Sequence, residues 1–118
     1  MVITKRDTPP MAPLTAAVFH ILLSLSRGSM HGLGIAQDVD ESTGGSFALG
    51  PGTLYRSLKE MTCTGLIVEA GAPEGGADPR RRFYTITERG REAVTAEAER
   101  MARIVEVARQ NRVLPEGL

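Results

Sequence analysis

The chain has 118 residues, of which 42% are hydrophobic and 24% charged, a size and composition typical of one globular domain. It has no apolar run near the roughly 18 to 20 residues that cross a bilayer, and prolines interrupt its N-terminus, so we expect neither a membrane protein nor a signal peptide. Lys plus Arg and Asp plus Glu both number 14, so net charge gives no indication of nucleic-acid binding. The single cysteine, Cys63, excludes an intrachain disulfide, and we expect a cytoplasmic protein.

The first half of the chain predicts an arm and two helices. Residues 1–13 hold three prolines and predict an irregular arm, with Pro13 well placed to start a helix. The first helix is expected to end at Arg27-Gly28, and the second, after a short connection, at Gly44-Gly45. Their apolar positions recur with helical spacing: Leu14, Ala17, Val18, Ile21, Leu22 and Leu25, then Leu33, Ile35, Ala36 and Val39.

A third helix is marked by its first residues. Gly50 can occupy the N-cap, and Pro51 suits the first helical position because it has no N–H to leave unpaired. Apolar residues at 54, 58 and 61 define a buried stripe, and the helix should end near Thr64-Gly65. An arginine can bind guanine through two hydrogen bonds, and lysine, tyrosine and hydroxyl groups can hold phosphates. The residues of this helix expected to contact DNA are Gly52, Thr53, Tyr55, Arg56, Ser57 and Lys59.

A β-wing is predicted after Gly65. Residues 66–69 and 82–86 are rich in β-branched and aromatic types and predict two strands, joined by a glycine- and proline-rich turn over residues 71–79. Arg80, Arg81 and Arg82 stand where the second strand begins, and we expect them to contact the DNA backbone or minor groove.

The C-terminal part predicts a dimerisation helix. Thr87 is a suitable N-cap, and the helix should reach about Arg112. Its apolar residues follow the alternating four-and-three spacing of a coiled-coil seam, which predicts an interface between two copies. The seam consists of Val94, Ala98, Met101, Ile104, Val105 and Ala108. The expected fold is mainly α with a small β-wing: an arm (1–13), a winged helix-turn-helix DNA-binding domain (14–87), the dimerisation helix (88–113) and a tail (114–118).

A set of ordered motifs resembles the PadR family of bacterial winged-helix transcriptional regulators over about residues 14–95. The motifs are His31-Gly32, Gly45, residues 49–55, Gly65-Leu66-Ile67, residues 81–87 and Gly90. The resemblance implies a homodimer that binds a pseudo-palindromic operator in double-stranded DNA, usually as a repressor, with release by a small effector in some members. The short C-terminal helix is similar to the shorter PadR subfamily. The chain departs from the family at Leu33, where an aromatic residue is common. It also lacks the tryptophans with which drug-binding relatives stack flat ligands.

Other functions are open alternatives. A winged helix can be an adaptor that binds protein and never DNA. A metal or redox sensor is a further alternative, but His20, His31 and Cys63 lack the spacing of a dedicated metal site, and we expect no metal and no cofactor. His31 is expected instead to bond to backbone at the start of the second helix. No nucleophile, base and orienting partner can be assembled, so we do not expect an enzyme.

Overall fold

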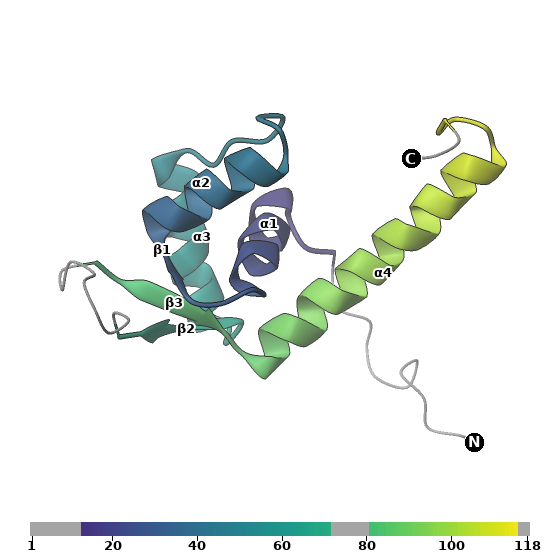
Figure 1. Ribbon diagram of the computed structural model, residues 1–118. Coiled ribbons are helices and arrows are strands. Elements are labelled where there is room, and N and C mark those ends of the chain that lie inside the picture. The colour runs from purple at the N-terminus through teal and green to yellow at the C-terminus, as the bar shows by residue number, and fades with distance from the viewer. Residues whose placement is uncertain (1–12, 72–80, 116–118) are drawn as a thin grey trace, which may run out of the picture.

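The computed structural model of the chain describes residues 13–71 and 81–115. These residues form, in chain order, α1 (Ala16–Leu25), β1 (Met30–His31), α2 (Gly32–Ser42), α3 (Pro51–Cys63), β2 (Ile67–Ala70), β3 (Phe83–Ile86) and α4 (Glu88–Gln110). Figure 1 shows α1, α2 and α3 grouped together above the sheet, with α4 running from the sheet past α1 and beyond the group. The expected fold, mainly helical with a small β-wing, is confirmed. Most of the predicted arm, Arg80 in the wing and the end of the predicted tail lie outside the described residues.

α1 begins at Ala16, three residues after the start that the sequence indicates at Pro13. Thr15, not Pro13, precedes the first turn, and its hydroxyl accepts a hydrogen bond from the N–H of Val18 at 3.2 Å. A threonine hydroxyl satisfies an amide that would have no partner inside the helix, which is why this position takes the N-cap. The helix ends at Leu25, and the chain turns at Gly28, whose φ of 153° favours glycine.

The core lies where the three predicted apolar stripes meet. Each of the first three helices contributes residues that are at most 2% exposed, and the sheet adds one more. These residues are Ile21, Leu22 and Leu25 of α1, Ile35 and Val39 of α2, Leu54, Leu58 and Met61 of α3, and Ile67 of β2. The helical periodicity therefore predicted the buried face of each helix, but it was wrong for Leu33 of α2, which is 55% exposed.

The sheet has three strands, whereas the sequence predicted two. Its order is β1-β3-β2, and both pairs are antiparallel. β1 has only two residues, and Met30 pairs with Tyr84 and His31 with Phe83. A two-residue strand has no periodicity of its own and forms here because β3 offers a free edge. As a result, the start of α2 is attached directly to the wing.

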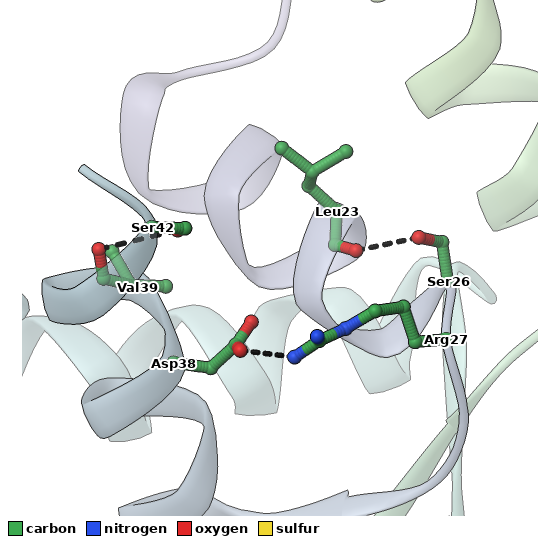
Figure 2. Close-up of polar contacts among 6 residues, drawn as sticks. All are labelled: Leu23, Ser26, Arg27, Asp38, Val39 and Ser42. Atoms are coloured by element: carbon green, nitrogen blue, oxygen red, sulfur yellow. Dashed lines mark hydrogen bonds and ion pairs between the residues drawn. The ribbon is translucent and has the colours of Figure 1, made fainter.

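An ion pair joins the end of α1 to α2. Figure 2 shows Arg27, just after α1, reaching toward Asp38 on α2, while the Ser26 hydroxyl donates to the carbonyl oxygen of Leu23 within α1. The Arg27 side chain is 66% exposed, and exposed pairs contribute only about 0–1 kcal/mol. Core packing, rather than this pair, therefore holds α2 against α1.

Two features fix the start of α4. The hydroxyl of Thr87 accepts a hydrogen bond from the N–H of Gly90 at 3.1 Å, as predicted for an N-cap, and also contacts the carbonyl oxygen of Leu66 at 3.0 Å. Gly90 lies so close to β2 and β3 that a Cβ there would be 2.2 Å from the Leu66 carbonyl oxygen and 2.8 Å from Ile86 Cγ1. The helix ends at Gln110, near the predicted end. Within the described residues, no helix is both long and apolar enough to cross a membrane.

Gly90→Ala should reduce the free energy of unfolding by about 1–3 kcal/mol, because the added methyl group would collide with a backbone carbonyl that cannot move independently. Gly52→Ala is the matched control, since a Cβ at Gly52 meets nothing within 4 Å. Chemical denaturation of both variants checks this. Equal stability of the two variants would contradict the close packing of α4 on the sheet.

Glu97 anchors the chain before α1 to α4. Its side chain is buried, accepts a hydrogen bond from the N–H of Leu14 at 3.2 Å and pairs with Arg100. The bond from Arg100, followed by that from Leu14, lowers the pKa of Glu97 below its ordinary value of 4.5. A carboxylate with a lowered pKa stabilises the fold above its unfolded-state pKa, and this contribution disappears as pH falls through the folded-state pKa.

Glu97→Gln should therefore be less stable than the wild type at neutral pH, and the difference should shrink as pH falls below about 4.5. Denaturation of both proteins from neutral pH to about pH 3 measures this difference. A difference that stays constant over the whole range would mean that the charge of Glu97 is irrelevant to stability.

Candidate nucleic-acid interface

The outer face of α3 carries most of the residues predicted to contact DNA. Because Leu54, Leu58 and Met61 are buried, the helix presents Tyr55, which is 52% exposed, to the outside. The other exposed members of the predicted set are Gly52, Thr53, Arg56 and Lys59. Neither Arg56 nor Lys59 forms an ion pair with any described residue, so both cations are available to a ligand.

Ser57 lies on the other side of α3. It is 8% exposed and lies beside Leu54 and Met61 on the side of the helix that faces the core. A residue with so little accessible surface cannot reach a ligand on the outer face, so the inclusion of Ser57 among the DNA contacts was wrong on geometry. Ser57 lies three residues after Leu54 and four before Met61, so the helical period places it on the buried face.

The wing arginines have different partners. The Nη1 atom of Arg81 lies 3.0 Å from Nε2 of His31, at the junction of β1 and α2. Arg82 donates to the carboxylate of Glu69 on β2 at 3.2 Å, although its side chain remains 75% exposed. Arg80 lies outside the described residues. Arg81 and Arg82 are thus both held close to the body of the domain.

A groove of about 760 Å³ separates α3 from the wing. Tyr55 and Lys59 line it from α3, Arg81 and Arg82 line it from the wing, and Glu69 is the only acidic residue among the lining residues described. Three cations against one carboxylate make the groove electropositive although the whole chain has no net charge. Such a surface attracts phosphates.

Tyr84 contributes to the groove from β3. The residue is 6% exposed, and burial raises its pKa above the ordinary value of 10.0, with the Glu69 carboxylate adding to the shift and Arg82 opposing it. The phenol therefore stays neutral around physiological pH. The neutral hydroxyl group of Tyr84 lines the groove and adds no negative charge that would repel an anion.

Gly32 allows Tyr55 to lie against the start of α2. A Cβ at Gly32 would be 3.1 Å from both Cε1 and the hydroxyl oxygen of Tyr55. The close approach explains why glycine follows His31, and it places the Tyr55 hydroxyl beside the groove. No pattern in the sequence predicted a site role for Gly32, Glu69 or Tyr84, although the motifs His31-Gly32 and residues 81–87 include two of them.

The predicted seam of α4 divides into two parts. Val94 is 7% exposed and belongs to the core of the chain itself, so it is not a free interface residue. Farther along, Met101 and Val105 are each 40% exposed and Ile104 is 63% exposed. Ala98 is exposed and Ala108 half-buried. Val107, which lies off the predicted seam, is a further exposed apolar residue at 51%.

The three candidate metal or redox residues lie in unrelated environments. His20 stacks on Phe47 with ring centroids 4.8 Å apart, Cys63 is exposed at the end of α3, and His31 caps α2. As predicted, His31 bonds to backbone: its Nδ1 accepts from the N–H of Gly34 at 3.1 Å. Among the described residues, no three His, Cys, Asp or Glu side chains gather in a way that could hold a metal ion.

Comparison with known proteins agrees with this architecture. Residues 21–96 match the family model described as "Transcriptional regulator PadR-like family", which covers more than half of the chain. No curated protein matches the chain. Several solved structures share its fold.

A PadR family transcription regulator from hypervirulent Clostridium difficile R20291 is 27% identical, with a TM-score of 0.70, and the match covers 81% of this chain and 97% of that one. RosR of H. salinarum is 26% identical, with a TM-score of 0.59 and coverage of 86% and 96%. Bacillus subtilis PadR in complex with operator DNA is 23% identical, with a TM-score of 0.59, and the match covers 69% of this chain and 45% of that one. The last likeness concerns the fold alone. From the family match and the shared winged-helix fold, the chain belongs to the PadR-like family of transcriptional regulators.

Proposed function

We propose that the protein is a cytoplasmic, homodimeric repressor that binds a pseudo-palindromic operator by inserting α3 of each subunit into the major groove. The observation that carries this proposal is the exposed face of α3, where Tyr55, Arg56 and Lys59 stand beside an electropositive groove. The fold shared with Bacillus subtilis PadR in complex with operator DNA supports it. Release by a small effector stays a prediction of the family resemblance.

Each contact of α3 follows from the chemistry of its side chain. Arg56 has a planar group with paired donors, which suits the O6 and N7 atoms of guanine. Lys59 and Tyr55 border the groove and suit phosphates, which fix the position of the protein without reading sequence. Thr53, exposed in the first turn of α3, adds a hydroxyl for a phosphate. The wing arginines extend the contact to the flanking backbone.

We assign a second copy of the chain as the partner that packs against the C-terminal half of α4. In its first half, one face of α4 buries Ala93, Val94 and Glu97 against the core. The same face continues as Met101, Ile104 and Ala108, but Figure 1 shows that α4 has by then passed beyond the three-helix group. An apolar stripe that its own core cannot cover needs a partner, and the four-and-three spacing suits an identical helix.

One measurement distinguishes the proposed DNA-binding regulator from the alternative, an adaptor that binds only protein. Binding to a duplex of random sequence is measured while the salt concentration is raised. A DNA-binding protein binds weakly at low salt and loses affinity along a linear log–log slope, because bound cations release counterions. Absence of any binding at low salt would favour the adaptor and contradict the proposal.

Arg56→Ala should remove about 1–3 kcal/mol of affinity for the best-binding duplex and relax base preference at one position of each half-site. Lys59→Ala is the matched comparison on the same face, and it should weaken binding to all duplexes alike. Competition binding with a set of single-base variants measures both effects. If Arg56→Ala also lost affinity equally on every sequence, Arg56 would be a phosphate contact.

Met101→Asp combined with Val105→Asp should convert the dimer to monomers, because each carboxylate would be buried in the interface without a partner. Operator affinity should fall as well, since a monomer presents a single α3. Gln110→Asp adds the same charge on the opposite side of α4, nine residues along from Met101, and should leave the dimer intact. Sedimentation or light scattering gives the masses. Dimers that persist in the double variant would refute this interface.

A further inference from the structure

His31 has two polar contacts that a neutral imidazole cannot satisfy together. Its Nδ1 accepts the N–H of Gly34 at 3.1 Å, so the hydrogen of a neutral ring must be on Nε2. Nη1 of Arg81 lies 3.0 Å from that same Nε2. A guanidinium group can only donate. Two donors therefore face each other across a distance at which a hydrogen bond needs one donor and one acceptor.

Two donors 3.0 Å apart can both bind one acceptor that lies beside them. A phosphate oxygen fits best, because hydrogen bonds to charged oxygens are the strong ones and Arg81 supplies a full positive charge. The nearest carboxylate of the groove, Glu69, is already bound by Arg82 at 3.2 Å. Within the described groove, the His31 and Arg81 donors are thus left for an external anion.

The position of this donor pair matches the path of a DNA strand. Both residues line the groove between α3 and the wing, together with Lys59 of α3. If α3 enters a major groove and the wing contacts the flanking backbone, one strand must pass over this groove. In helix-turn-helix proteins the helix before the recognition helix crosses the DNA backbone, and His31 caps the start of that helix here.

We infer that His31, through its Nε2–H, and Arg81 together hold one phosphate of the DNA backbone in each half-site. The inference rests on the proposed function and adds a neutral donor that belongs to α2 rather than to α3 or the wing. Since Nδ1 of the same ring caps α2, the phosphate, the start of α2 and the wing become linked through one side chain.

His31→Ser separates the two roles of the ring. Serine is among the best N-caps and can still accept the N–H of Gly34, but it has no donor at the position of Nε2. We expect nearly unchanged thermal stability and about tenfold weaker binding to a duplex selected from a random pool. The salt slope should stay the same, because no cation is lost. Arg81→Ala should weaken binding and also lower the slope by about one.

The variant that combines His31→Ser with Arg81→Ala tests whether both residues bind the same phosphate. If they do, its loss should fall short of the product of the two single losses, because each group holds the phosphate less well without the other. Arg91→Ala, an exposed arginine of α4, is the control and should leave both affinity and slope unchanged. If the affinity loss of the double variant equals the product of the two single losses, the two residues do not share one phosphate.

The outcomes distinguish this inference from the proposed function. If the wild-type protein binds no duplex at low salt, both the proposed function and the phosphate contact would be refuted. If the wild-type protein binds DNA and His31→Ser binds equally well, only the phosphate contact inferred for His31 and Arg81 would be refuted. His31→Asn, which also keeps a capping oxygen, repeats the test should the serine variant fold poorly. Ring nitrogen chemical shifts of wild-type His31 give a check without any substitution: hydrogen on Nε2 is expected, and hydrogen on Nδ1 would overturn the inference.

Discussion

The burial of one apolar row on α3 sets the geometry of the rest of the molecule. Leu54, Leu58 and Met61 are at most 2% exposed, and burying each such side chain stabilises the fold by about 1.5–3 kcal/mol. Rotating α3 by one residue would lose most of that stabilisation, so the helix has one possible orientation. Arg56 and Lys59 must then face outward. The chemistry of the exposed face is thus a consequence of core packing.

The sheet positions two further parts of the domain, the start of α2 and the start of α4. β1 joins the start of α2 to β3, which brings His31 to Arg81. At the other end, Thr87 and Gly90 fix α4 against the Leu66 carbonyl oxygen. The direction in which α4 leaves the sheet therefore depends on a few short contacts. In the dimer that we propose, that direction sets how far apart the two copies of α3 lie.

Strong local signals predicted most of this structure. The N-caps at Gly50 and Thr87 and the core faces of the first three helices follow from residue type and spacing, and the structure confirms them except for Leu33, which is exposed. Features that depend on tertiary contact were not predictable in this way. β1 exists only through its pairing with β3, and Val94 is covered by its own core because α4 crosses α1 before it projects outward. The groove combines side chains from α2, α3 and the wing, which no periodicity brings together.

In the complex that we propose, two copies of this domain present α3 to one duplex at a spacing fixed by paired α4 helices. Selection of bound duplexes from a random pool, followed by sequencing, measures that spacing. We expect two inverted half-sites whose centres are about 34–36 Å apart, one helical turn, or a multiple of that distance. Enrichment of a single unpaired site, of direct repeats or of no sequence at all would contradict it.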